Sequence, residues 1–104
     1  MQAVGFIEVY GLVAAFVAAD AACKAANVTI ESFDNNKPQN ADKLPVPLVI
    51  IVKIRGSLED VKTALTAAVE AANKVSGVVT SHVIPRPERD TEKLLKLNCL
   101  SRGK

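Results

Sequence analysis

The sequence predicts an α+β fold, in which a four-stranded antiparallel sheet carries two main helices on one of its faces. The first observation behind this prediction is that two segments, Leu12–Ala26 and Ser57–Val75, space their apolar residues as helices do. The second is that stretches rich in β-branched residues flank both segments. The resulting order, strand, helix, strand, strand, helix, strand, forms two β-α-β halves around a central hairpin, which is the ferredoxin-like arrangement.

The first half of the chain is predicted to contain two strands and one helix. The strand over Ala3–Tyr10 combines β-branched and aromatic residues. The helix over Leu12–Ala26 is rich in alanine and ends at Asn27, which suits the left-handed conformation of many helix caps. A second strand follows over Val28–Phe33. The apolar stripe expected to face the core consists of Leu12, Phe16, Ala19, Cys23 and Ala26.

The segment between the two halves, Asp34–Pro45, is predicted to be an expanded loop. It has no apolar periodicity, several turn-forming residues and two prolines. Its length of about twelve residues is large for a compact domain, and loops of this length are usually functional or flexible.

The second half begins with a strand over Val46–Arg55 and continues with a helix capped by Ser57. Alternation in the strand predicts one buried face, which carries Leu48, Ile50, Val52 and Ile54. The apolar stripe of the helix comprises Leu58, Val61, Leu65, Ala68, Ala72 and Val75.

The C-terminal part is predicted to contain a last strand over Val78–Ile84, which ends at Pro85 because proline cannot continue the ladder. A short C-terminal helix is expected over Asp90–Leu97, followed by a polar tail over Asn98–Lys104. The chain would thus be one domain over residues 1–97 with a tail over residues 98–104.

The sheet face away from the helices is expected to be apolar as well. It would include Val9 or Tyr10, Val49 and Ile51, which are more stable against another apolar surface than in water. The core is built mainly from Ala and Val, each of which buries little area, so a subunit interface would add appreciably to stability. We therefore expect an oligomer.

Composition and charge exclude several classes of function. The net charge of +2 is small and the basic residues are dispersed, which does not favour nucleic acid as a partner. The longest apolar runs are shorter than the roughly 18 residues of a membrane span, and the N-terminus lacks the pattern of a secretory signal. The two cysteines have no CxxC spacing, as expected of free thiols in the cytoplasm.

Few residues could support catalysis. His82 is the only histidine, and no Cys, Asp or Glu accompanies it at the spacing of metal ligands. The run Arg55–Ser57 lies between a strand and a helix but lacks both common phosphate-binding glycine patterns. We therefore expect a protein that is not an enzyme and that has no metal or cofactor.

Two basic residues have distinctive surroundings. Arg86 lies in the stretch His82–Pro87 (HVIPRP), between two prolines that restrict the backbone and project the side chain outward, as suits a rigid contact. Lys24 lies at the end of the first helix, four residues after Asp20, where a cation complements the helix dipole.

As a set, these features resemble the bacterial microcompartment shell domain from about Ala3 to Leu95, apart from the loop. HVIPRP after a short strand is the most specific of them. The pieces that occur in the matching order are Gly5–Glu8, Gly11-Leu12, Ala18–Asp20, Lys24, Asn27-Val28, Val52–Gly56 and His82–Pro87.

The resemblance implies a structural protein that forms flat cyclic homohexamers. These would tile, together with other shell proteins, into a polyhedral shell around encapsulated enzymes in the bacterial cytoplasm. It also implies that Lys24, accompanied by Asn27, lies against its counterpart across a two-fold contact between hexamers. Arg86 would insert into the edge of the neighbouring hexamer, with His82 close by.

The predicted loop departs from the family pattern, in which this segment is short, contains glycine and lines a central pore for small metabolites. The residues nearest to the family's pore positions are Asn35, Asn36, Lys37, Pro38 and Gln39. Six copies of Lys37 at a narrow axis would repel one another unless they point into solvent, which would favour anionic traffic. Alternatively, the long loop closes the pore or the hexamer is distorted.

The alternative function from another class is a trimeric ferredoxin-like regulatory protein that senses a small molecule, with the long loop binding the ligand between subunits. It predicts a compact trimer, whereas the shell hypothesis predicts a hexamer and larger assemblies.

Overall fold

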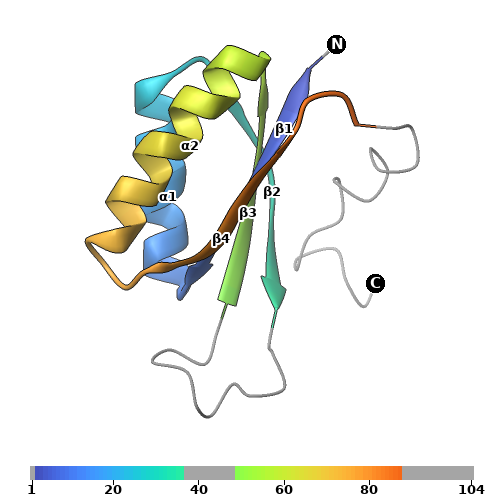
Figure 1. The fold of residues 1–104 in the computed structure, drawn as a ribbon. Coiled ribbons are helices and arrows are strands. Elements are labelled where there is room, and N and C mark those ends of the chain that lie inside the picture. Colours follow the sequence, from blue (N-terminus) through green and yellow to red (C-terminus); the bar gives the residue numbers. More distant parts are fainter. Residues whose placement is uncertain (1, 37–48, 88–104) are drawn as a thin grey trace.

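The computed structural model describes residues 2–36 and 49–87 of the chain. Their helices and strands follow the predicted order (Figure 1). The elements are β1 (Ala3–Tyr10), α1 (Leu12–Ala25), β2 (Thr29–Asn36), β3 (Val49–Gly56), α2 (Leu58–Asn73) and β4 (Val78–Ile84). The predicted C-terminal helix over Asp90–Leu97 and the tail over Asn98–Lys104 lie outside the described residues.

The four strands form one antiparallel sheet in the order β2-β3-β1-β4, so β2 and β4 are the edge strands. Both helices lie on the same face of this sheet (Figure 1). The predicted α+β architecture is therefore confirmed.

The register of the sheet decides which side chains face the helices. Ile7 pairs with Val52 and Val9 pairs with Ile50, and all four are buried in the core. Val9 therefore faces the helices, because residues paired across antiparallel strands share a face.

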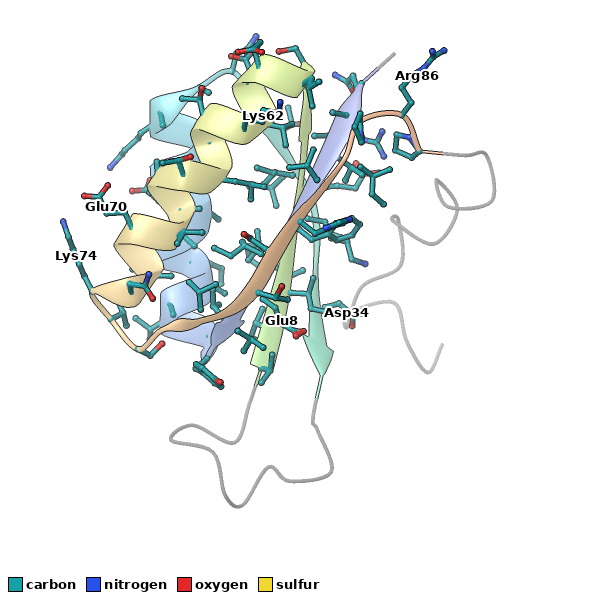
Figure 2. All side chains as sticks on the ribbon, in the orientation of Figure 1. Glu8, Asp34, Lys62, Glu70, Lys74 and Arg86 are labelled. Atoms are coloured by element: carbon teal, nitrogen blue, oxygen red, sulfur yellow. The ribbon has the colours of Figure 1, made fainter. Side chains whose placement is uncertain are left out.

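The opposite face is less apolar than predicted. Tyr10 pairs with Val49 there and Glu8 pairs with Ile51. The charged side chain of Glu8 therefore lies on the same face as the expected apolar residues. Figure 2 shows Glu8 and Asp34 on this side of the sheet. The alternation of side chains along one strand predicts which of its residues share a face. It does not predict the register with the neighbouring strands, which decides the polar residues that lie beside them.

The apolar stripe predicted for α1 was wrong for Leu12, Phe16 and Cys23, whereas Ala19 is buried as predicted. Leu12 is 48% exposed and Phe16 is 56% exposed, and Cys23 is exposed as well. The core face of α1 consists of Ala14, Ala15, Ala18, Ala19 and Ala22. Alanines allow α1 to approach α2 and the sheet closely, and the larger side chains lie on the other side of the helix because they do not fit into that narrow space.

The end of α1 also differs from the prediction. The helix ends at Ala25, with Ala26 as an extended cap, and no residue other than glycine has a positive φ in the described part of the chain. Asn27 is therefore not a left-handed cap. Instead its backbone lies close to Gly56: a Cβ on Gly56 would be 3.0 Å from the Asn27 carbonyl oxygen. A side chain at position 56 would thus disturb the connection from α1 to β2.

The strand β2 continues three residues further than predicted, to Asn36. Asp34, Asn35 and Asn36 belong to the strand because they pair with Ile51, Ile50 and Val49 of β3. Their polar side chains suggested a loop, but pairing with β3 satisfies their backbone groups. Residues 37–48, which include Lys37, Pro38 and Gln39, lie outside the described residues.

The helix α2 matches its prediction in the middle and differs at the ends. Ser57 caps it by accepting a hydrogen bond from the Asp60 backbone N–H at 3.1 Å. Its buried residues are Val61, Ala64, Leu65, Ala68 and Ala72. Leu58 and Val75 are exposed, at 36% and 46%.

Gly5 permits the close packing of α2 on β1, and we expect Gly5→Ala to lower the free energy of unfolding by about 1–3 kcal/mol. A Cβ at this position would be 2.7 Å from Val61 Cγ1 and 3.1 Å from Ile54 Cγ1. Both neighbours are fully buried, so neither side chain has space to move away. Chemical denaturation would measure the effect, with the exposed Thr80→Ala on β4 as the control. Equal stability of Gly5→Ala and wild type would mean that α2 adjusts without cost.

Candidate functional site

The sheet topology brings three of the four predicted edge residues to one end of the molecule. Arg55 on β3 pairs with Val4 on β1 and with Thr29 on β2, and Val4 also pairs with Ile84 at the end of β4. The start of β2 and the end of β4 therefore lie at the same end of the sheet (Figure 1). Lys24 lies in the last turn of α1, Asn27 lies in the connection from α1 to β2, and Arg86 lies two residues after the end of β4. We call this end of the molecule the outer end.

Lys24 is held by a neighbour on its own helix. Its Nζ lies 2.8 Å from Asp20 Oδ2, one turn earlier, and its side chain remains 76% exposed. The hydrogen bond to Asp20 and the charge of that carboxylate raise the pKa of Lys24 above its ordinary value. The ammonium is therefore protonated at neutral pH. Because exposed ion pairs contribute little to stability, this pair orients the lysine rather than supporting the fold.

Arg86 lies just beyond β4, where Figure 2 shows its side chain extending away from the body of the protein. Pro85 on one side is exposed, whereas Pro87 on the other side is buried and attaches the turn to the domain. The two prolines restrict the backbone around Arg86. The guanidinium is therefore presented to solvent from a rigid base.

His82 is exposed on β4, where it pairs with Phe6 on the sheet face away from the helices. It precedes Arg86 along the same edge of the sheet. Lys24 at the end of α1 and Asn27 after it lead into the other edge strand, β2, and the three strand spacings between β2 and β4 amount to about 14 Å. The four predicted residues thus form two pairs on opposite edges rather than one cluster.

Two of the predicted pore residues, Asn35 and Asn36, lie at the other end of the sheet. Asn36 closes β2 there and pairs with Val49 at the start of β3, and Asn35 precedes it. An eight-residue strand spans about 26 Å, which separates this end from the outer end. The connection between β2 and β3 starts at this end of the sheet, which we call the inner end.

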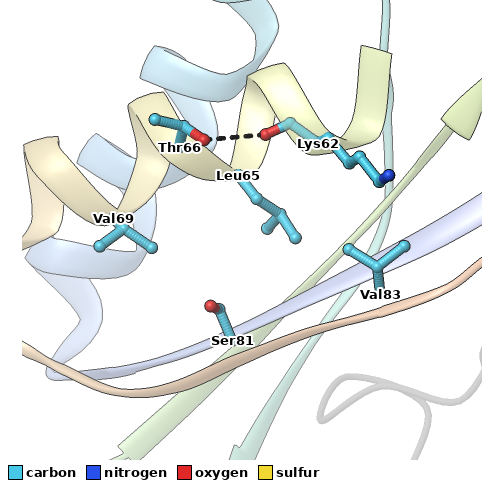
Figure 3. Close-up of a pocket in the computed structure, with 6 residues that line it drawn as sticks. All are labelled: Lys62, Leu65, Thr66, Val69, Ser81 and Val83. Carbon is cyan, nitrogen blue, oxygen red and sulfur yellow. Dashed lines mark hydrogen bonds between the residues drawn. The ribbon is translucent and has the colours of Figure 1, made fainter. Parts of the chain in front are cut away.

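Two surfaces of the molecule were not found by sequence reasoning. One is the exposed apolar side of α1 with Leu12, Val13 and Phe16. The other is a groove between α2 and β4, shown in Figure 3. Leu12 and Phe16 were assigned to the core because they follow helical spacing. The structure shows that the alanines of α1 face the core, so Leu12 and Phe16 lie on the exposed side of the helix. No periodic signal marks the groove, because residues from two distant segments line it.

The described residues contain no group of His, Cys, Asp and Glu that could hold a metal ion. Within the same ranges, neither helix is long and apolar enough to cross a membrane. Instead the molecule has charged side chains oriented at the ends of its elements, an alanine-rich core and apolar surface on α1. These features are typical of a structural protein that assembles with further protein subunits.

Comparison with known proteins identifies the family. The chain belongs to the BMC domain family, whose model matches residues 3–87. It is 40% identical over 94 residues to the bacterial microcompartment shell protein PduA of Citrobacter freundii, covering 90% of this chain and 91% of that protein. It is 35% identical over 97 residues to the carboxysome shell protein CcmK2 of a Synechocystis strain, covering 91% of this chain and 85% of the relative.

A solved structure confirms the fold. The crystal structure of a microcompartments protein from Desulfitobacterium hafniense superimposes with a TM-score of 0.68 and 25% identity. The match covers 92% of this chain and 47% of the other, so this chain spans about half of that protein. The protein is thus a structural subunit of a bacterial microcompartment shell in the cytoplasm, as the resemblance predicted. The trimeric regulatory alternative finds no support in these relatives.

Proposed function

We propose that this subunit forms cyclic homohexamers that tile edge to edge, together with other shell proteins, around encapsulated enzymes. The observation that carries the proposal is the separation between the two ends of the sheet. Lys24, Asn27 and Arg86 belong to the outer end, and the connection between β2 and β3 leaves from the inner end. A ring with the inner ends around its axis would present the outer ends along its rim.

The chemistry of the outer end suits a seam between rings. Two Lys24 ammoniums that meet across a two-fold axis would repel each other, but Asp20 within each subunit offsets part of this charge. Each ammonium also has donors left for backbone carbonyls of the opposite ring. Asn27, which is exposed beside it, can add an amide donor and acceptor.

Arg86 would act at the same seam from the other edge of the subunit. Its guanidinium carries five donors in a planar fork, which can bond several carbonyl oxygens of a neighbouring ring at once. His82 would lie beside this contact on β4. Each such contact is weak, but six edges per ring make the lattice strong through multivalency.

The inner end would form the pore. Six copies of Asn35, Asn36, Lys37, Pro38 and Gln39 would surround the axis. Amide groups can hydrogen-bond to small polar metabolites, and a ring of lysines would favour anionic ones. We also propose that the subunit has no catalytic activity of its own, because its residues act in contacts and permeation.

Electron microscopy and native mass measurement of the purified protein test the proposal. We expect rings of six subunits, which at 11.0 kDa each make about 66 kDa, and extended hexagonal layers at higher concentration. A monodisperse trimer that changes with a small ligand would contradict the proposal and support the regulatory alternative.

A further inference from the structure

We infer that residues 88–104, which we call the strap, lie across the sheet face that points away from the helices, and that charge holds the strap in place. Its acidic start lies over the cations of β3, and its first lysine lies over the carboxylates further along the sheet. The strap belongs to each subunit and does not depend on the proposed ring. It decides what the subunit presents to partners on this face.

The sheet face away from the helices is buried, although both helices lie on the other face (Figure 1). Val4 is 0% exposed and Val49 is 2% exposed, yet neither belongs to the core under the helices. Three polar residues on the same face are buried as well, namely Ser32, Asp34 and Lys53. Side chains on one sheet face shield one another only from the side, because all stand roughly perpendicular to the sheet. A further layer therefore lies over them.

This layer comes from the same chain, since the burial of these residues is that of a single subunit. The strap starts in the right place to provide it. Val4 pairs with Ile84 at the outer end, and Pro87, which is buried, follows three residues later. The strap therefore leaves the described part of the chain beside Val4.

The connection over residues 37–48 is less suited to cover this face. It starts and ends at the inner end, so it would have to run the length of the sheet and back to reach Val4 at the outer end. The strap needs to run in one direction only. Even as a helix it would extend about 26 Å, which is the length of an eight-residue strand.

The sequence of the strap provides both apolar and charged groups for this face. In the helix predicted at its start, one side carries Asp90, Lys93, Leu94 and Leu97, because these residues are three or four positions apart. The two leucines can pack on the buried valines of the sheet. The acid comes first along the strap, and the lysine follows one turn later.

The charges on the sheet face have a fixed order from the outer end. Arg55 comes first and Lys53 second, because alternate residues of β3 share a face. The carboxylates of Asp34 and Glu8 follow about 7 Å further on, since both residues pair with Ile51. Cations thus precede carboxylates on the path of the strap.

A strap that starts at the outer end meets these charges in the matching order. Glu31 pairs with Arg55 at 3.5 Å, so Lys53 is the cation that Asp90 offsets. A buried charge is costly without opposite charge nearby, and a carboxylate from the strap lowers that cost. Lys93 lies over the carboxylates in the middle of the sheet. The reverse order would bring like charges together.

The outward side of the strap replaces the sheet as the surface that partners meet. Glu92 and Lys96 lie opposite Leu94 on the predicted helix, because they are two residues away from it on either side. A partner that approaches from this side meets these two charges and not the strands.

Carbodiimide coupling of the wild-type protein tests the contact directly. The reagent joins an amine to a carboxylate that touches it, with loss of water, which converts the carbodiimide into a urea. We expect mass spectrometry of the peptides to show Lys93 coupled to Glu8 or Asp34 within one chain. Coupling of Lys93 only to carboxylates of the strap, or only to another copy in a mixture with isotope-labelled subunits, overturns the inference.

Release of the strap should expose Lys53. In the double variant Leu94→Glu, Leu97→Glu, we expect the acylation rate of Lys53, relative to that of Lys74, to rise about tenfold over wild type. Lys74 is a suitable reference because its side chain is 76% exposed. Circular dichroism checks that the variant remains folded, and Lys96→Glu is the control because it adds the same acid on the outward side. Unchanged reactivity of Lys53 in the folded double variant contradicts the strap.

A matched pair of charge reversals tests the role of Asp90. Asp90→Lys brings a second cation to Lys53, and we expect the acylation rate of Lys53 to rise about threefold, because one ion pair contributes less than two buried leucines. Glu92→Lys makes the same change on the outward side and should have no effect. Equal rates in the two variants would show that Asp90 does not hold the strap.

The strap and the ring can fail separately. Acylation compares two lysines of one subunit, so it does not require a hexamer. Absence of hexamers from the wild-type protein overturns the proposed function and leaves the strap standing. A Lys53 that stays protected when the strap carries two glutamates overturns the strap and leaves the hexamer standing.

Discussion

Lys24→Asp is expected to abolish the extended layers while leaving the ring of about 66 kDa intact, that is, six subunits of 11.0 kDa. In the variant, two carboxylates would meet across the seam, and Asp20 one turn earlier would add two more negative charges. Four acidic groups in one contact repel one another and offer no donor to the carbonyls of the opposite ring. Electron microscopy would measure the loss of layers, and native mass spectrometry would measure the ring.

The chain offers a closely matched control for this variant. Lys74 is also 76% exposed and pairs with an acid one turn earlier, Glu70, at 4.0 Å. It lies at the end of α2, away from the outer end (Figure 2). We therefore expect Lys74→Asp to form layers normally. Loss of the ring itself in Lys24→Asp would show that Lys24 belongs to the interface within the ring.

Arg86→Ala is expected to have the second largest effect, again on the layers and not on the ring. The side chain is exposed and extends away from the domain, so its removal should leave the melting temperature of the subunit almost unchanged. It would, however, remove the planar donor group from every edge of the hexamer, and multivalent contacts amplify such a loss.

A conservative variant tests whether the shape of the guanidinium matters. Arg86→Lys keeps the charge but replaces the planar fork by a compact ammonium, so we expect only partial recovery of the layers. Layers that form normally from Arg86→Ala would mean that the outer end makes its contacts without this residue. Turbidity and electron microscopy at matched protein concentration would distinguish these results.

The alternation of β3 illustrates what local pattern can predict. Ile50, Val52 and Ile54 recur with the period of a strand, and all three are buried under the helices. The cap of α2 was also evident, because Ser57 followed by Glu59 and Asp60 is a local signal. In both cases the relevant neighbours are close in sequence.

The surface of α1 shows where local pattern fails. Leu12 and Phe16 have the spacing and hydrophobicity of core residues, yet the alanines between them face the core. The distance between α1, α2 and the sheet decides this, and that distance depends on all three elements together. The same holds for Asn36, whose strand conformation results from its pairing with Val49.

By itself the sequence determined the order of the elements, their approximate bounds and the shell family, because these depend on spacing along the chain and on compact motifs such as HVIPRP. The tertiary structure decided which side of α1 is buried, and it brought the end of α1 with Lys24 and the end of β4 before Arg86 to the same end of the molecule. It also formed the groove between α2 and β4. These features arise from contacts between residues far apart in the chain, so no local pattern could encode them.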